Sequence, residues 1–308
     1  MCYTFPRIGF VIACALSTVG SVLSQSPDPK IAEPVYGRHI VPLLARLGCN
    51  SGACHGAVQG QNGFRLSLFG VDPAQDRDHL MRDAAGRRLD LNNPGNSLFL
   101  MKALGQIPHE GGVRVRPLSW EYRLLQQWVS QGVPTGELPK SRVTKLTVTP
   151  PASTVKLGDS ISLRVEAAFA DGTKEDVTGF CTFETQDRDV AKSEDGGRIV
   201  TLQPGHSAVV IRYGSEPVVA MVTVPRPGAA DFPAAKGNNF IDEHILAQLK
   251  RLNIPPSDVC DDATFLRRVS LDLTGGLPSA EEVRAFLSDK NPDRRAKKID
   301  ELLARPGY

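Results

Sequence analysis

The sequence predicts a multidomain α + β protein in which a helical domain, an all-β sandwich and a second helical segment follow one another. Apolar residues recur at helical spacing over 35–136, at a period of two over 143–225, and again at helical spacing over 238–308. A Pro/Ala/Gly-rich stretch at 226–237 is typical of a linker between the second and third parts. A chain of 308 residues is long enough for two or three domains.

The charge and the aromatic content exclude nucleic acid as a partner. The net charge is +2, which gives the chain as a whole no attraction for a polyanion or a membrane surface. The 5 Tyr and 2 Trp are too few for a surface on which bases stack. The apolar fraction of 41% and the charged fraction of 23% are those of an ordinary soluble globular protein.

Residues 1–24 are typical of a secretory signal peptide. Arg7 supplies a positive charge, an apolar run extends from Ile8 to about Leu23, and small residues precede the expected cleavage site. The run is too short and interrupted for a membrane span. We therefore expect an exported protein, periplasmic or at the cell surface, with a lipid anchor at Cys14 as the alternative. Outside the cytosol, thiols are oxidised or bound to another group.

Three helices are predicted in the first domain. One carries its apolar residues on one face over 39–47 and ends at Gly48. A second is expected over 97–104. A third is expected over 119–129. It should end before Gly132, because a glycine followed closely by a proline ends a helix.

The middle of the chain is predicted to be strands. Apolar and polar residues alternate over 161–169, and this run ends at Asp171 and Gly172, which is a hairpin signal. A second strand pair is expected over 209–213 and 218–224. Short strands with regular turns indicate an antiparallel sandwich, although the Cys and Trp residues of an antibody domain are missing.

Two cysteines and a histidine stand together in residues 48–56, Gly-Cys-Asn-Ser-Gly-Ala-Cys-His-Gly. Covalent haem attachment needs two thiols for the vinyl groups and a histidine directly after the second thiol as iron ligand. His55 directly follows Cys54, but four residues rather than the usual two separate the thiols. A longer loop is chemically permissible, so the spacing leaves haem attachment and a Cys49–Cys54 disulfide open. A structural zinc lacks a second Cys/His pair.

Four motifs, in order along the chain, resemble the planctomycete-type cytochrome c domain. They are LARLGCNSGACHG (44–56), GFRLSLFGVDP (63–73), PHEGG (108–112) and EYRLLQQWVSQGVP (121–134). The resemblance implies an all-α cytochrome c-like domain at 35–136 that carries covalent haem c. It also implies that Cys49 and Cys54 form the haem thioethers and that His55 is the proximal iron ligand.

Two residues are candidates for the sixth iron ligand. His109 stands in a glycine-flanked loop before the last predicted helix, where a cytochrome c fold delivers its distal ligand. Met101 is the rival, and its thioether would raise the reduction potential. Met101 lies among leucines in a predicted helix, where methionine more often fills a core.

Two further resemblances cover most of the remaining chain. Residues 169–178, FADGTKEDVT, resemble the group 2 bacterial Ig-like (BIG2) domain, which implies an Ig-like sandwich at 143–225. Residues 265–289 resemble the start of the uncharacterised DUF1549 domain, which implies a helical DUF1549-like segment at 238–308. Proteins of this kind are large and secreted, so we expect the chain to be a fragment of a longer protein.

These features together predict haem binding and electron transfer, either as a carrier or as the module through which electrons enter a larger oxidoreductase. No catalytic set is visible, because a nucleophile motif, a phosphate loop and a His/Glu metal pattern are all missing from the sequence. Residues 37–134 contain 10 Arg and 1 Lys against 7 Asp and Glu. This excess of positive charge would attract an acidic redox protein, or it belongs to a solvated face. The alternative is a cell-surface interaction or adhesion protein without haem, with a Cys49–Cys54 disulfide and an Ig-like domain that binds a glycan or a protein of the cell envelope.

Overall fold

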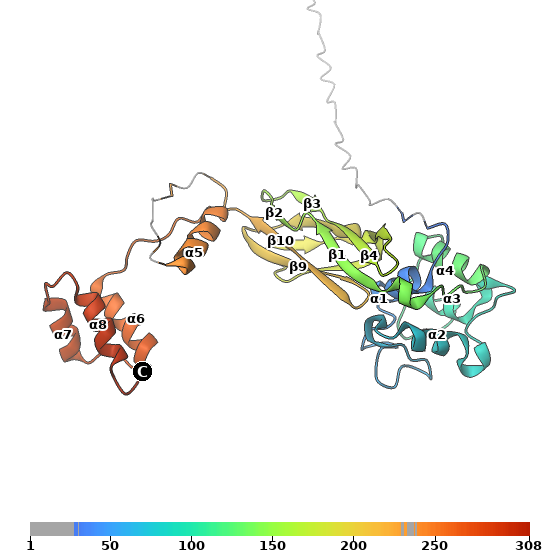
Figure 1. The fold of residues 1–308 in the computed structure, drawn as a ribbon, viewed down its shortest axis with the longest axis horizontal. Coiled ribbons are helices and arrows are strands. Elements are labelled where there is room, and N and C mark those ends of the chain that lie inside the picture. The colour runs from blue at the N-terminus through green and yellow to red at the C-terminus, as the bar shows by residue number, and fades with distance from the viewer. Residues whose placement is uncertain (1–27, 30, 229–230, 233–236, 238) are drawn as a thin grey trace, which may run out of the picture. The chain divides into compact units, whose positions relative to one another are not determined.

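The computed structural model describes residues 28–29, 31–228, 231–232, 237 and 239–308 (Figure 1). The predicted signal peptide at 1–24, with Cys14, lies outside the described residues. The chain divides into two compact units, 1–228 and 229–308. The boundary between them falls inside the predicted linker.

The first part of unit one is helical with long irregular loops. Its helices are a π-helical turn at Tyr36–Ile40, α1 at Val41–Arg46, α2 at Pro73–Met81, α3 at Leu98–Ala103 and α4 at Trp120–Ser130. Single 3₁₀ turns lie at Leu68–Gly70, Asp83–Gly86, Pro94–Asn96 and Leu138–Ser141. The core centres on Trp128, which stacks on Tyr36 with 5.5 Å between ring centres. Both aromatic side chains are fully buried.

The three predicted helices are confirmed as α1, α3 and α4. Ser119 caps α4, because its side chain accepts a hydrogen bond from the amide of Tyr122. The apolar stripe of α4 then buries Leu125 and Trp128. Helix α2 was not predicted, because its sequence is almost entirely polar and Leu80 is its one fully buried apolar residue among those described.

The second part of unit one consists of ten strands. They are β1 Val143–Thr149, β2 Ala152–Thr154, β3 Ser160–Ser162, β4 Arg164–Phe169, β5 Lys174–Asp176, β6 Cys181–Thr185, β7 Ala191–Ser193, β8 Arg198–Thr201, β9 Gly205–Tyr213 and β10 Glu216–Val224. They form sheets in the orders β1-β4-β5, β2-β10-β9-β6 and β3-β8-β7. Alternate residues of β4 and β9 are buried, so the sheets enclose a sandwich-like core.

The predicted hairpins are confirmed, while two strand predictions are wrong in detail. The β4–β5 pair turns at Gly172, which has a φ of 84° that favours glycine. The single strand expected over 161–169 is divided into β3 and β4, which belong to different sheets. Leu163 lies between them and donates from its amide to the carbonyl of Gly197 at 2.8 Å. The sheets are also not purely antiparallel, because β2 runs parallel to β10.

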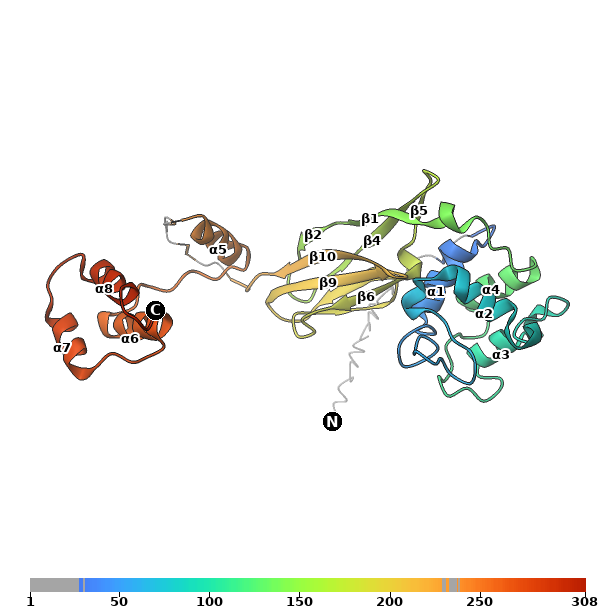
Figure 2. The same ribbon diagram turned by 60° about the horizontal axis from the view of Figure 1, so that its bottom comes forward.

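Polar contacts join the helical part to the sandwich within unit one. Arg38 is 8% exposed and forms ion pairs with Asp171 and Glu175 of the β4–β5 hairpin. His39 contacts the second oxygen of Glu175 at 3.0 Å, and Tyr213 of β9 donates to the carbonyl of Arg38. Helices α1–α4 lie together at one end of the sandwich in both views (Figure 2).

Unit two contains α5 at Phe240–Arg251, α6 at Asp262–Thr274, α7 at Ala280–Ser288 and α8 at Arg294–Leu303. Leu266, Phe286 and Leu302, one from each of the last three helices, are its buried apolar residues among those described. A capping box between Ser279 and Glu282 forms the start of α7. Within the described part of the chain, none of the helices is long and apolar enough to cross a membrane.

Candidate functional site

A cavity of about 740 Å³ lies in the helical part, and Cys49, Cys54 and His55 line it. Its volume falls in the roughly 300–1,000 Å³ range of cofactor and small-molecule sites. Phe64 and Leu66 form apolar walls together with Leu98, Phe99 and Ala103 of α3. The loop before α4 adds His109. The structure therefore brings the cysteine–histidine motif and one candidate sixth ligand to the same cavity.

The chain between the two thiols forms a compact turn. Helix α1 is followed by Gly48, whose φ of 75° is left-handed. The amide of His55 donates to the carbonyl of Cys49 at 3.0 Å. A Cβ at Gly56 would lie 2.1 Å from the carbonyl oxygen of Asn50, so only glycine fits there. The extra residues between the thiols are thus accommodated in a turn that returns His55 to Cys49.

His55 has one ring nitrogen tied to the backbone. Its Nδ1 lies 3.0 Å from the carbonyl oxygen of Phe64, which can only accept, so Nδ1 carries the proton. Burial lowers the pKa of His55, with further lowering from His109 and Arg88, while the Phe64 carbonyl opposes the shift. The ring is therefore neutral at neutral pH, and its Nε2 is the basic nitrogen that a metal would bind.

His109 has the same arrangement. Its Nδ1 lies 2.9 Å from the carbonyl oxygen of Gly112, which fixes Nε2 as the basic nitrogen of this ring as well. The rings of His55 and His109 have centres 6.2 Å apart and planes only 9° apart. A Cβ at Gly111 would lie 2.9 Å from the His109 ring, so a side chain there would push on this ring.

The spacing of the two ring centres matches that of two imidazoles that bind one ion. Metal–nitrogen bonds of about 2 Å place the centres of two such rings roughly 6 Å apart. Hydrogen bonds from Nδ1 to a carbonyl are the usual support of metal-binding histidines. No group of three or more His, Cys, Asp or Glu suited to a metal is found among the described residues. A haem iron needs only one or two protein ligands, because the porphyrin nitrogens supply the rest.

Met101, the rival sixth ligand, lies elsewhere. It is half-buried in α3, which directs Leu98, Phe99 and Lys102 to the cavity. Met101 is not among the described residues that line the cavity. The structure thus brings His109, but not Met101, to His55.

Both thiols of the motif lie on the cavity and are free in the structure. Burial raises the pKa of Cys49 to about 12, although Arg114 lowers it. The Arg114 guanidinium also approaches Cys54, with Nη2 3.6 Å from Sγ. The other described cysteines, Cys181 and Cys260, are free as well.

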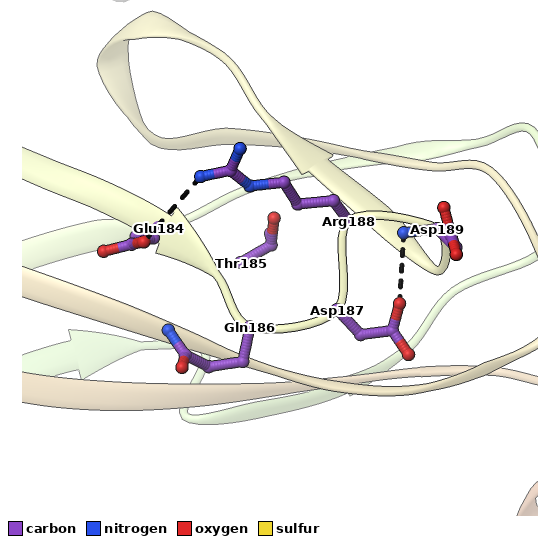
Figure 3. Close-up of a pocket in the computed structure, with 6 residues that line it drawn as sticks. All are labelled: Glu184, Thr185, Gln186, Asp187, Arg188 and Asp189. Carbon is purple, nitrogen blue, oxygen red and sulfur yellow. Dashed lines mark hydrogen bonds and ion pairs between the residues drawn. The ribbon is translucent and has the colours of Figure 1, made fainter.

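A second hollow, of about 460 Å³, is formed by residues 184–189 of the sandwich (Figure 3). Its polar groups mostly bond to one another. Asp187 accepts from the amide of Asp189 at 3.1 Å, and Arg188 lies 3.9 Å from Glu184. This hollow is one open turn after β6, and its contacts are those of a solvated loop.

Residues 240–308 match a protein family described as a protein of unknown function, DUF1549. This match confirms the DUF1549-like segment predicted at 238–308 and does not extend to the cavity of unit one.

Solved structures of an S-layer protein are similar to parts of the chain. Domains 5–6 of SbsC match with 18% identity and a TM-score of 0.25 over 30% of this chain and 48% of theirs. Domains 4 and 5 of SbsC match with 18% identity and a TM-score of 0.24, over 27% of this chain and 52% of theirs. A longer piece, rSbsC(31-844), matches with 18% identity and a TM-score of 0.26, over 30% of this chain and 14% of its own length. The chain thus spans about half or less of these structures, and the likeness is weak. No curated protein matches the sequence.

Proposed function

We propose that the protein is an exported c-type cytochrome-like electron carrier whose haem iron is held between His55 and His109. One observation carries the proposal. The two rings are nearly parallel, 6.2 Å apart, and both are bonded through Nδ1 to backbone carbonyls. Loop residues hold this arrangement on the wall of a cavity of cofactor size.

The remaining residues of the motif have roles that follow from their place on the cavity. Cys49 and Cys54 would form the two thioether bonds, and both line the same cavity as His55. When bound, haem supplies one-electron oxidation and reduction at iron. His55 and His109 would both hold the iron, which would favour electron transfer over binding of a substrate at the iron.

Within this proposal, residues 35–136 form a cytochrome c-like domain and residues 143–225 a BIG2-like sandwich. The ion pairs of Arg38 support a fixed attachment of one to the other. The sandwich would hold the haem domain at a cell-envelope or surface partner, in the periplasm or outside the cell. The electron partner would be another redox protein, or an oxidoreductase of which this chain is one module.

The proposal is tested by expressing the mature chain in an exporting host that has haem-attachment machinery. A Soret absorption band that survives denaturation, together with an intact mass raised by one haem, supports it. Cys54→Ser should leave at most one thioether bond, while Cys181→Ala, in the sandwich core, serves as the control that keeps the haem. A chain without a Soret band, with a mass two hydrogens below the reduced form, would contradict the proposal and favour the disulfide-containing surface protein.

A further inference from the structure

A buried arginine forms part of the cavity wall. Arg88 is 7% exposed, and its guanidinium lies 4.6 Å from the centre of the Phe64 ring. Its Nη1 donates to the carbonyls of His79 at 2.7 Å and Asp83 at 3.1 Å, and its Nη2 donates to Gly63 at 2.8 Å. These bonds connect three separate segments, so the guanidinium is held in one position.

The charge of Arg88 is not balanced within the described part of the chain, where no carboxylate lies within ion-pair distance of it. Two arginines of the helical part, buried Arg38 and half-buried Arg46, do pair with acids. Arg38 pairs with two acids of the sandwich, and Arg46 pairs with Glu121 at 2.9 Å. Burial lowers the pKa of Arg88, the negative charge of Asp83 opposes this shift, and Arg87 adds to it. Buried charges are normally paired.

Two donors of Arg88 are left for a ligand. A guanidinium has five N–H donors in a planar fork, and the three bonds to carbonyls use two on Nη1 and one on Nη2. The N–H groups that these bonds do not use are one on Nη2 and the one on Nε. The Nη2–Nε edge of a guanidinium can bind the two oxygens of a carboxylate.

We propose that Arg88 binds a carboxylate of the cofactor, one of the two propionates of haem. The inference rests on the proposed function and adds which residue recognises the anionic edge of the group. The other charged residues on the cavity support an anionic ligand, since Arg87, Lys102 and Arg114 line it against one acid, Glu110. Lys102 donates to the carbonyl of Pro108 and Arg114 contacts Cys54, which leaves Arg88 as the buried cation that has bonds to spare.

The test compares two probes on the full mature chain produced without haem attachment. The probes are Fe(III) protoporphyrin IX and its dimethyl ester, in which both carboxylates are capped, and the dissociation constants come from absorbance titration. The free acid should bind about 10- to 100-fold more tightly than the ester, the usual effect of a hydrogen bond to a charged group. Arg88→Leu should abolish this preference, and Arg88→Lys should retain part of it.

Arg116→Leu is the matched control, because Arg116 is exposed and is not among the described residues lining the cavity. It should keep the full preference for the free acid. Equal binding of acid and ester to the unaltered chain overturns the assignment of Arg88 and leaves the proposed function standing. A preference that Arg88→Leu does not reduce also overturns it. Failure of both porphyrins to bind contradicts the proposed function itself. If Arg88→Leu does not fold, Arg88→Lys and the unaltered chain decide the question.

Discussion

His39 and Glu175, 136 residues apart in the sequence, are joined by a 3.0 Å contact between Nε2 and Oε2. The amide of Val35 donates to Nδ1 of His39, so Nε2 carries the proton and donates to the carboxylate. Glu175 binds Arg38 through its other oxygen at 2.7 Å. One carboxylate of the sandwich therefore holds two side chains of the helical part.

This contact predicts an acid-sensitive attachment between the two parts. The bonds from His39 lower the pKa of Glu175, Arg38 adds to the lowering, and burial opposes it. A glutamate whose pKa is lower in the folded chain than in the unfolded chain stabilises the fold. This stabilisation is complete above the unfolded-state pKa of about 4.3 and is lost as the pH falls through the folded-state pKa. Thermal unfolding should therefore shift to lower temperature below about pH 4.

Glu175→Gln removes the titrating group and tests this. We expect the free energy of unfolding at pH 7 to fall by about 1–3 kcal/mol, with a flatter dependence on pH below 5 than in the unaltered chain. Glu166→Gln is the control, because Glu166 is exposed and pairs with Lys174 across two neighbouring strands. Equal acid sensitivity in the unaltered chain and in Glu175→Gln would refute the role of this carboxylate.

Gly56 is predicted to be indispensable for the turn that carries His55. A Cβ at this position would lie 2.1 Å from the carbonyl oxygen of Asn50, and this oxygen belongs to the backbone and cannot move aside cheaply. Gly56→Ala should cost about 2–4 kcal/mol of unfolding free energy, measured by denaturant titration. Gly52→Ala, on the same loop, places its Cβ no closer than 4.0 Å to any side chain and should cost less than about 1 kcal/mol. Equal costs for the two would contradict the turn geometry.

Most residues of the candidate site could be picked out from the sequence more easily than the framework around them. Cys49, Cys54 and His55 are recognisable because their chemistry is local, in one short motif, and a resemblance indicated His109. Arg88 was missed, since nothing in the sequence distinguishes it from the neighbouring Arg87, which is exposed. The guanidinium of Arg88 bonds to the carbonyls of Gly63, His79 and Asp83, and these contacts are set by the fold.

The same limit applies to the fold. Helix α4 was predictable because its cap and apolar stripe are local signals, whereas α2 has a polar sequence and hardly any stripe. At Leu163, between β3 and β4, the amide donates a hydrogen bond to the carbonyl of Gly197. The alternation of apolar and polar residues in the sequence cannot reveal this bond. The contact of His39 with Glu175 likewise depends on how the helical part meets the sandwich.

The thiol of Cys49, half-buried on the cavity wall, should react slowly in the folded, haem-free chain. Burial raises its pKa to about 12, so nearly all of it is protonated at pH 8, and the thiolate is the form that reacts. Alkylation by iodoacetamide, followed by peptide mass mapping, should be slower at Cys49 than in the denatured chain by about two orders of magnitude or more. Rapid folded-state alkylation would show that Cys49 is not held in the cavity wall as described.

The final prediction concerns the two candidates for the sixth iron ligand. His109 lies 6.2 Å from His55 between ring centres, while Met101 lies on α3 and not among the described residues of the cavity lining. In the haem-loaded chain, His109→Ala should convert a six-coordinate low-spin absorption spectrum to a five-coordinate or water-ligated one. His109→Met, which would place a thioether at the iron, should raise the reduction potential. Met101→Leu is the matched control and should change neither spectrum nor potential. A spectral change in Met101→Leu together with an unaltered spectrum in His109→Ala would assign the thioether as the ligand and reject His109.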